Sequence, residues 1–522
     1  MLKRRVGIIG GGPGGLAAAM LLAKAGLDVT VHEARDVLGG RSATITAPTD
    51  RGTFRFDTGP TFFLYPRVLQ DIFAACGRRL EDEVELIRLD PQYHLVFEDG
   101  AELHATGDLT RMAAELARLS PADAAALPRF MEDNRAKLAV FRPILEAAFN
   151  GMRDLGRPEV LRGLSKLRPH RSVDRDLAVY FRDKRVRLAF SFQSKYLGMS
   201  PFRCPSLFTI LSFMEYEYGV YHPRGGTGAV IAAMARVARD LGARIDLGQP
   251  VQEILFEGRR AVGLRAGDVE RRYDALVINA DFAQAMTRLV PDRLRRRWSD
   301  RKIARKKFSC STFMMYLGIE GTLPELAHHT IFLAEDYRRN LHEIEAGQAP
   351  GAPSFYVQNA CVTDPALAPP GHSTLYVLVP VGHRVGEGVD WPREQARYRA
   401  LALQRLERIG LRGIEGRIRF EKVVTPQGWE QDLQVFRGAT FNLAHNIRQM
   451  LHWRPRNRFE DLDGVYLVGG GTHPGSGLPV IFEGARITSR LLTDDLGIAP
   501  NWSPASAMAA DHYEPVVAEV IG

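Results

Sequence analysis

The order of apolar and polar stretches predicts that one kind of structural unit recurs along the chain. Residues 6–9 form a short apolar run, glycines follow, and an Ala- and Leu-rich stretch over 16–25 leads to a second apolar run at 29–32. Continuous apolar runs are typical of buried parallel strands, and the longer stretch between them has the length of a helix. The beginning of the chain therefore predicts a strand, a turn, a helix and a second strand.

Similar units return in the middle and near the end of the chain. A glycine turn, a helix and a strand are expected over 221–258, a buried strand lies within 273–281, and residues 464–492 again have the pattern of strand, glycine turn and helix. Between them, the Ala-, Leu- and Arg-rich residues 66–200 indicate helices, whereas period-2 runs between about 308 and 440 indicate strands. We therefore expect an α/β fold whose main domain is assembled from separated segments.

The composition is that of a folded globular protein. The chain has 522 residues, of which 45% are hydrophobic and 25% charged, and its length suggests two or three domains. No run of 18 apolar residues occurs, so a membrane-spanning helix is not expected. The four cysteines lack C-x-x-C spacing, which predicts neither a disulfide framework nor a zinc site and favours a reducing compartment. We expect no metal site.

The N-terminal stretch has a basic head and an apolar body, so a secretory signal is one interpretation. Residues 10–15, however, contain five glycines and one proline. In a helix interior each glycine costs roughly 1 kcal/mol and proline about 3 kcal/mol relative to alanine, and a signal's apolar region should be helical. The glycines instead form G-x-G-x-x-G as Gly10, Gly12 and Gly15, directly after the predicted strand.

This motif predicts a dinucleotide site. Gly10 permits a tight turn, Gly12 allows a pyrophosphate to approach the backbone, and Gly15 allows helix and strand to pack closely. The helix N-terminus offers free N–H groups to phosphates. Glu33 ends the second strand about 20 residues further on, where an acid accepts ribose hydroxyls and disfavours a 2′-phosphate. The alternative is a glycine-rich turn with a purely structural role.

One basic run stands out in a chain of net charge +8. Residues 293–307 contain nine Lys or Arg and one Asp, interleaved with Leu294, Trp298 and Ile303. One interpretation is a solvated helix face followed by a loop. The other is a patch that binds anionic lipid head groups, which attract each basic residue by roughly 1 kcal/mol. No nucleic-acid-reading motif accompanies the run, so we expect no nucleic-acid partner.

Beyond the glycine motif, several segments resemble the bacterial carotenoid desaturases, which comprise the phytoene and 4,4′-diapophytoene desaturases within the FAD amine-oxidase-like superfamily. The matching segments are 10–33, "GGR" at 39–41, "FDTGPT" at 56–61, "YHPRGGTG" from Tyr221, "VINAD" ending at Asp281 and "LVGGGTHPGSGLP" ending at Pro479. The resemblance spans about residues 5–495 and extends to interior stretches such as "FSFQSKYLGMSPFRCPSLFT". It is closest to the branch that acts on C30 diapophytoene, alongside the C40 enzymes.

The resemblance implies a Rossmann-type FAD-binding domain built from discontinuous segments, with an inserted β-sheet substrate domain and a helical membrane-facing part. The implied division is residues 1–70, 215–300 and 440–498 for the FAD domain, 71–214 for the helical insertion, 301–439 for the substrate domain and 499–522 for a loose tail. The cofactor residues it implies are Gly10, Gly12, Gly14, Gly15, Glu33, Gly40, Arg41, Gly59, Pro60, Thr61, Val251, Gly470, Gly471, Leu478 and Pro479. The C-terminal glycine turn has no cysteine, so non-covalent FAD is expected.

The implied activity is the introduction of conjugated double bonds into a long C30 or C40 isoprenoid. Hydride goes to flavin N5 and a proton leaves the neighbouring carbon, with a quinone or oxygen as the final electron acceptor. Family precedent suggests an acid–base pair at Asp154 and Arg157; the alternative is an ion pair between residues i and i+3. Glu483 and Arg486 have the same spacing near the C-terminal glycine turn, and we expect them to be helix-face or structural residues. Other functions left open are a carotenoid isomerase or saturase, an amine-oxidase-like flavoenzyme, and a flavin-free prenyl-binding protein like the Rab GDP-dissociation inhibitors.

The apolar substrate of such an enzyme resides in a bilayer. We therefore expect a peripheral, monotopic protein at the cytoplasmic face of the cell membrane, with its contact surface near the helical insertion at about 80–200. Residues 205–216 are candidates for the lining of a substrate tunnel, although a Phe/Leu/Ile stripe of this kind is more commonly ordinary core. The adjacent His328 and His329 are expected to point to opposite sides of a strand or loop.

Overall fold

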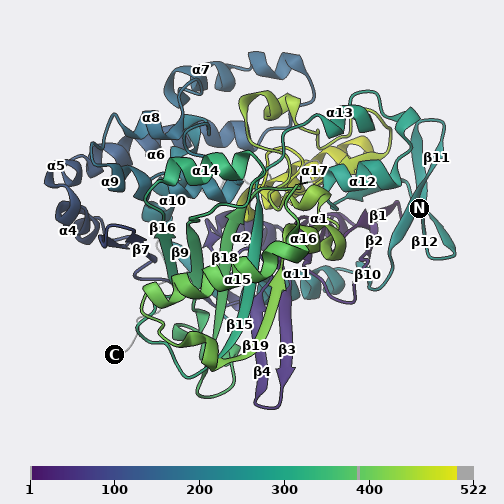
Figure 1. Cartoon of the computed structure of the whole chain (residues 1–522). Coiled ribbons are helices and arrows are strands. Elements are labelled where there is room, and N and C mark those ends of the chain that lie inside the picture. Colours follow the sequence, from purple (N-terminus) through teal and green to yellow (C-terminus); the bar gives the residue numbers. More distant parts are fainter. Residues whose placement is uncertain (1–2, 385–387, 503–522) are drawn as a thin grey trace.

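The computed structural model describes residues 3–384 and 388–502 (Figure 1). Its main domain contains a five-stranded parallel sheet in the order β10-β2-β1-β14-β20. The strands are β10 (Arg244–Asp246), β2 (Asp28–His32), β1 (Arg5–Ile9), β14 (Ala275–Ile278) and β20 (Val465–Leu467). This sheet joins the beginning, middle and end of the chain, as the recurring pattern predicted.

Helices cover this sheet and supply most of its core. They are α1 (Pro13–Lys24), α2 (Arg67–Ala75), α3 (Leu80–Glu83), α11 (Thr227–Asp240), α12 (Phe282–Leu289), α13 (Asp300–Ala304) and α17 (Leu478–Asp495). Helix α1 is buried along almost its whole length, because its Ala- and Leu-rich sequence packs between the sheet, α11 and α17. Small antiparallel sheets complete the domain: β3 (Thr44–Thr49) with β4 (Gly52–Asp57), β5 (Phe63–Leu64) and β6 (Leu86–Arg88) with β9 (Val220–Pro223), and β11 (Val251–Glu257) with β12 (Arg260–Ala266) and β13 (Val269–Arg272).

A second, seven-stranded sheet has the order β19-β15-β18-β17-β16-β7-β8. Its strands are β19 (Ile418–Val424), β15 (Ser311–Glu320), β18 (His372–Val381), β17 (Phe355–Gln358), β16 (His329–Leu333), β7 (Tyr93–Phe97) and β8 (Glu102–Ala105). The last two strands belong to the segment 71–214, for which mostly helices were predicted. Tyr93, Leu95 and Phe97 alternate with half-buried neighbours, and this short period-2 pattern places β7 beside β16.

Helices from the first insertion pack at one end of the seven-stranded sheet (Figure 1). These are α4 (Leu109–Leu119), α5 (Pro121–Ala124), α6 (Leu127–Leu145), α7 (Pro158–Leu167), α8 (Val173–Leu177), α9 (Lys184–Ala189) and α10 (Ile210–Tyr218), and α14 (Tyr337–Glu345), α15 (Trp391–Arg408) and α16 (Pro426–Leu433) flank the sheet elsewhere. Within the described residues, no helix has the length and apolarity needed to cross a membrane. Most of the predicted tail, residues 503–522, lies outside the described residues.

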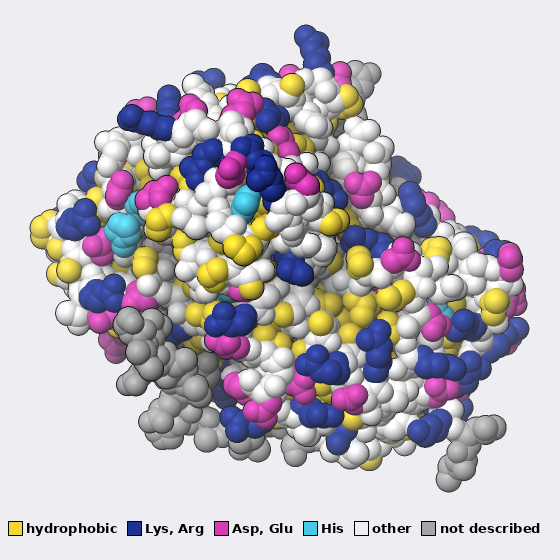
Figure 2. Space-filling view, turned by 90° about the horizontal axis from the view of Figure 1, so that it is seen from below, with side chains coloured by type: hydrophobic (Ala, Val, Ile, Leu, Met, Phe, Trp, Pro, Cys, Tyr) yellow, Lys and Arg dark blue, Asp and Glu magenta, His cyan; other side chains and the backbone are white. Residues whose placement is uncertain are grey.

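The basic run at 293–307 is not one solvated face. Trp298 is buried and donates a hydrogen bond from its indole N–H to Glu460, and Ile303 belongs to the same core. The Arg295 guanidinium is also buried and donates to the Trp298 carbonyl and to Asp300. On the face shown in Figure 2, basic and acidic side chains are interspersed and hydrophobic side chains gather in a band across the middle. The aromatic residue of the run is therefore not available to insert into lipid.

Candidate active site

A cavity of about 1340 Å³ extends between the two sheets and the helices of the insertion. One end is formed by the glycine turn after β1 and by residues at the end of β2, including Gly12 and Glu33. The middle is bordered by the C-terminal turn, where Gly470 and Gly471 lie, and an apolar region continues from there to Ile331 and Met450. The cavity therefore joins a polar, nucleotide-like end to an apolar one.

The geometry of the first glycine turn follows from its sequence. Gly10 has a φ of +101°, a conformation that strongly favours glycine. A Cβ on Gly15 would lie 2.2 Å from the Gly10 carbonyl oxygen, so α1 approaches β1 as closely as it does only because residue 15 has no side chain. Gly12 precedes α1, borders the cavity and provides no side-chain cap, so the N–H groups of the first turn have no side-chain partner from Gly12.

Glu33 lies at the end of β2 and borders the cavity. Its carboxylate accepts hydrogen bonds from the backbone N–H groups of Gly11, at 2.7 Å, and Arg35, at 3.0 Å. Val251, at the start of β11, borders the same end. A fixed carboxylate beside a strand end and a glycine turn has the geometry of a ribose-binding site.

A second loop brings further predicted residues to the cavity, namely Gly40, Arg41, Gly59, Pro60 and Thr61. The Arg41 guanidinium is buried and donates to the Thr440 carbonyl. Burial lowers the pKa of Arg41, although the nearby Asp281 carboxylate opposes this effect. The same burial raises the pKa of Asp281, which Arg41 in turn opposes. This arrangement places a positive charge near the middle of the cavity, where a phosphate is favoured.

The C-terminal turn precedes α17 and is held by a buried arginine. Arg454 is fully buried and donates to the carbonyl groups of Gly470 and Thr472. His445 accepts a hydrogen bond from the Ser476 N–H at its Nε2 atom. These contacts hold the backbone of the turn in place. The cavity wall at this turn is formed by Gly470, Gly471, Leu478 and Pro479.

Most of the predicted cofactor residues therefore come together around one cavity. Gly14 and Gly15 do not border it; a Cβ on Gly14 would lie 2.7 Å from the Asn279 side-chain oxygen, so both glycines serve helix packing. Sequence analysis missed Asn279 and Asp281, which follow β14 and border the cavity. Asn279 donates to the Gly10 carbonyl at 3.1 Å, and the polar end of the "VINAD" segment was the signal that could have identified it.

The apolar region contains aromatic and aliphatic side chains from both insertions and from the main domain. They include Phe62, Phe192, Tyr196, Phe208, Leu211, Met214, Ile331, Leu333, Phe355, Tyr356 and Met450. Part of the 205–216 stripe thus borders the cavity, and part belongs to the core. Lys195 is a charged exception on this wall, and burial lowers the pKa of its ammonium group.

A buried carboxylate lies one layer behind the apolar wall. Glu215 is fully buried and accepts hydrogen bonds from the Tyr93 hydroxyl, at 3.0 Å, and the Gln193 amide, at 2.9 Å. The hydroxyl of Tyr196, which borders the cavity, interacts with the same carboxylate. Burial raises the pKa of Glu215 to about 7, although the hydrogen bonds of its partners oppose this shift.

The predicted acid–base pair, Asp154 and Arg157, lies outside the cavity wall. Arg157 donates to Asp154 at 2.6 Å, and the Asp154 carboxylate also accepts the backbone N–H groups of Asn150 and Gly151. Neither side chain borders the cavity. This geometry corresponds to the structural ion pair that the i, i+3 spacing also allowed.

Glu483 and Arg486, which have the same spacing, do border the cavity. Their side chains form an ion pair at 2.8 Å, and Asp71 lies 3.6 Å from Arg486. Burial raises the pKa of Glu483 to about 7.

The prediction that His328 and His329 point to opposite sides was wrong. Their ring centroids lie 4.5 Å apart, because His328 precedes β16 and is not constrained by strand alternation.

Comparison with known proteins agrees with this geometry. The family model described as flavin containing amine oxidoreductase matches residues 13–491. The chain belongs to this family. Within it, the chain is 42% identical over 489 residues to a 4,4′-diapophytoene desaturase (4,4′-diapolycopene-forming) from Methylomonas, covering 93% of this chain and 94% of that protein. It is also 42% identical over 506 residues to an all-trans-zeta-carotene desaturase from Myxococcus xanthus, covering 95% and 94%. The resemblance to carotenoid desaturases is thereby confirmed.

Solved structures of this family share the fold. A putrescine oxidase matches with a TM-score of 0.59 at 17% identity, covering 95% of this chain and 99% of that one. Cyclohexylamine oxidase from Brevibacterium oxydans matches with a TM-score of 0.57 at 16% identity, covering 95% and 100%. The family implies a flavin cofactor, and the residues around the cavity fit one: Gly12 brings a glycine turn to one end, Glu33 is a fixed acceptor, and Gly470 and Gly471 bring a second glycine turn to the same wall.

Proposed function

We propose that the protein is an FAD-dependent desaturase that introduces conjugated double bonds into a C30 or C40 acyclic isoprenoid. The observation that carries this proposal is the single cavity that runs from Gly12 and Glu33, past the Gly470 turn, into an apolar region. A dinucleotide and a long hydrocarbon can then meet at the C-terminal turn. The curated relatives named above are desaturases of such hydrocarbons, which supports the assignment.

FAD is the flavin favoured, because the G-x-G-x-x-G turn and Glu33 at the end of β2 provide sites for a pyrophosphate and an adenosine ribose. Glu33 and Val251 are placed to hold its adenosine half, Arg41 and the first turn of α1 its phosphates, and Gly470, Gly471, Leu478 and Pro479 the remainder. When bound, a flavin supplies the hydride-accepting chemistry that desaturation of an allylic C–C bond requires. The acceptor that reoxidises it is a quinone or oxygen.

Non-covalent binding of FAD is part of the proposal. Cys310 is the cysteine that borders the cavity among the residues the structure describes. Burial raises the pKa of its thiol, so the nucleophilic thiolate is disfavoured. Acid precipitation is therefore expected to release free FAD and to leave a polypeptide with the mass calculated from its sequence, whereas a mass increased by one flavin would contradict this part of the proposal.

The proton lost in desaturation needs an acceptor near the apolar region. Tyr196 borders that region and interacts with Glu215, whose pKa of about 7 lets the carboxylate accept a proton near neutrality. The pair Asp154 and Arg157 lies outside the cavity wall and is assigned a structural role. Glu215 and Tyr196 are therefore the residues proposed to remove the proton from the substrate side of the cavity.

A membrane surface is the proposed source of the substrate, with the protein bound peripherally at the cytoplasmic face of the cell membrane. Helix α7 packs on α6, and the C-terminal part of α6 borders the cavity. Leu161 and Leu164 of α7 are 55% and 52% exposed, and Met152 nearby is 65% exposed. The exposed Arg162 and Lys166 lie among these apolar side chains, a combination that suits an anionic lipid surface.

Co-expression tests the activity directly. The full chain is produced in a carotenoid-free host together with either a diapophytoene-forming or a phytoene-forming synthase, and the pigments are separated by chromatography. A yellow flavoprotein and longer conjugated products from one of the two precursors are expected. Unchanged precursor with a flavin-loaded protein would contradict desaturation; geometric isomers alone would indicate an isomerase, and products with fewer double bonds a saturase.

Assays of the purified protein distinguish two further classes of function. Hydrogen peroxide formed from an amine would indicate an amine oxidase. A flavin-free protein that co-purifies with prenyl lipid would indicate a binding protein like the Rab GDP-dissociation inhibitors. The desaturase proposal expects neither result.

A further inference from the structure

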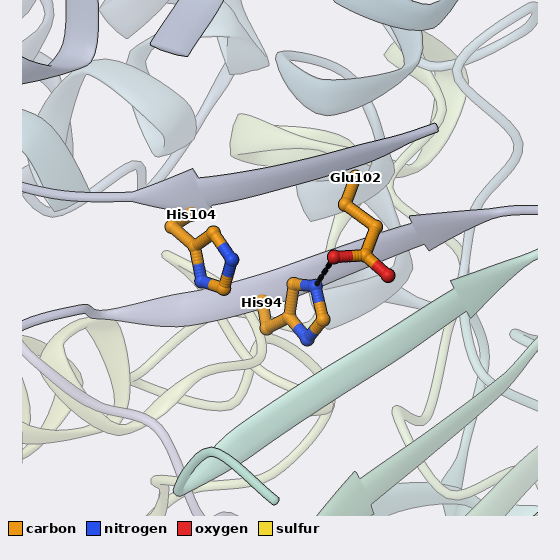
Figure 3. A group of neighbouring side chains, drawn as sticks. All are labelled: His94, Glu102 and His104. Carbon is orange, nitrogen blue, oxygen red and sulfur yellow. Dashed lines mark ion pairs between the residues drawn. The ribbon is translucent and has the colours of Figure 1, made fainter. Parts of the chain in front are cut away.

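Two histidines and a glutamate meet at the edge of the seven-stranded sheet, away from the cavity (Figure 3). His94 of β7 and His104 of β8 are direct cross-strand partners, and Glu102 stands two residues before His104 on the same face of β8. One potential ligand atom from each side chain lies within 4.8 Å of the other two. The three side chains therefore converge on one point, which sequence analysis did not anticipate.

The contacts around this cluster leave ligand atoms free. The His94 Nε2 atom lies 3.3 Å from a Glu102 carboxylate oxygen, and it is buried without a hydrogen bond. The two imidazole rings stack with centroids 4.3 Å apart and planes 5° from parallel.

We propose that His94, His104 and Glu102 form a binding site for a divalent late first-row transition metal such as Zn²⁺. Two imidazoles and a carboxylate are a donor set that such ions prefer. Tetrahedral Zn²⁺ holds two imidazole nitrogens about 3.3 Å apart, given Zn–N bonds of about 2.0 Å. The two rings must turn out of their stacked, nearly parallel arrangement for both nitrogens to face one ion, and water completes the coordination.

The surrounding charge favours a cation at this position. Glu115 of α4 accepts the backbone N–H of His104 at 3.0 Å, and its carboxylate also acts electrostatically on His94. Arg118 forms an ion pair with Glu115 at 3.2 Å, so one guanidinium lies beside this carboxylate. Two carboxylates and one guanidinium therefore lie around the two imidazoles, so the acidic side chains outnumber the basic one.

The position of the site points to a structural role. β8 is the last strand of its sheet, and β7 pairs with β16, where Thr330 is opposite His94. The next residues of β16, Ile331 and Leu333, border the cavity. A metal that joins β7 to β8 would thus brace the edge of the sheet that forms the cavity wall. This inference does not depend on the proposed function.

Metal titration of the flavin-loaded full chain, carrying no added histidines, tests the site. Zn²⁺ binding is followed by calorimetry and Co²⁺ binding by its d–d absorption. We expect one tight site, a rise in melting temperature with Zn²⁺, and a Co²⁺ spectrum without thiolate charge transfer. A thiolate charge-transfer band would instead indicate that Co²⁺ binds a cysteine such as the half-buried Cys361. Binding of no metal by the native chain would overturn the proposal.

Variants locate the site. H104A is expected to weaken Zn²⁺ binding more than tenfold and to abolish the rise in melting temperature. E102Q changes a side chain that is 48% exposed, so it should fold and still lose most of its affinity. H170A removes an exposed histidine outside the cluster and serves as the matched control. Equal affinity of H104A, E102Q and the control would overturn the proposal.

Discussion

The Glu33 carboxylate accepts the Gly11 N–H at 2.7 Å and thereby ties the end of β2 to the glycine turn after β1. A second N–H, from Arg35, holds the other oxygen. The acid is thus fixed before any cofactor binds, which reduces the entropy that binding would otherwise cost. The recognition of a ribose and the local order of the turn depend on the same side chain.

Replacing this acid should weaken FAD binding without unfolding the chain. A hydrogen bond to a charged group contributes about 1.5–3 kcal/mol, so E33A is expected to bind FAD roughly 10- to 100-fold less tightly. The flavin-to-protein ratio after purification, and the Kd for added FAD measured by fluorescence quenching, check this. E253Q changes a surface carboxylate paired with Arg265 and should have no effect. Full flavin content in E33A would contradict the assigned role.

Gly12 and Gly15 should respond differently to alanine. In G15A the new methyl group meets the Gly10 carbonyl at 2.2 Å, which the backbone cannot accommodate, so a loss of at least about 2 kcal/mol in unfolding free energy is expected.

In G12A the closest atom is the Asn279 amide nitrogen at 3.0 Å, and the φ of −76° suits alanine. This variant should keep its melting temperature within a few degrees and lose flavin, because the methyl group meets Asn279 where both residues border the cavity. Thermal unfolding and flavin content, measured on both variants, check the contrast. Similar behaviour of the two variants would contradict it.

Glu215 should make stability depend on pH. Burial raises its pKa from 4.5 to about 7, so the folded chain holds a proton between these values that the unfolded chain has lost. Its stabilising contribution is therefore complete below pH 4.5 and is lost as the pH rises through 7, a change of about 3 kcal/mol. Glu483, whose pKa burial also raises to about 7, contributes a decline of the same kind. Denaturant unfolding of E215Q should therefore show a smaller decline than the native chain, whereas E217Q, a change at a partly exposed carboxylate two residues further on, should retain the full decline.

The same group should appear in the rate profile. If Glu215 removes the proton, turnover rises with pH through about 7 in the native enzyme, and E215Q loses that limb together with at least about a hundredfold in rate. FAD content should not change, because Glu215 does not border the cavity. A native pH profile in E215Q would assign the carboxylate a structural role only.

The exposed leucines of α7 should mediate membrane binding. Removing two exposed leucines from a lipid contact should weaken sedimentation with anionic liposomes by tenfold or more, since burial of one such side chain contributes about 1.5–3 kcal/mol. L161S combined with L164S is the test variant. V269S, on β13 and 53% exposed, is the matched control. Equal sedimentation of the two would place the membrane contact elsewhere.

The sequence predicted those features of the site that depend on residues close together in the chain. The turn at Gly10, the close packing at Gly15 and the acid at Glu33 all follow from neighbouring residues, and the structure places them as expected. The polar end of its segment could have identified Asn279 as a site residue, but its partner could not be predicted, because Asn279 donates to the Gly10 carbonyl across 269 residues.

Long-range packing also explains the remaining differences. The local sequence around Trp298 is that of an amphipathic surface segment. In the structure, Glu460 from a distant segment accepts the indole N–H of Trp298. β7 and β8 are too short to stand out within a helical segment, and their partner β16 lies more than 200 residues later. The pairing of His94 with His104 depends on the register of that hairpin, which no local pattern specifies.

The five-stranded sheet also sets a schedule for biosynthesis. Its first strand ends at Ile9 and its last at Leu467, so the sheet is incomplete until the chain has left the ribosome as far as Leu467. At about 5–20 residues per second, β1 waits tens of seconds for β20. During that interval the edge of β14 has no neighbour, and nascent chains need protection by chaperones until the final strand arrives.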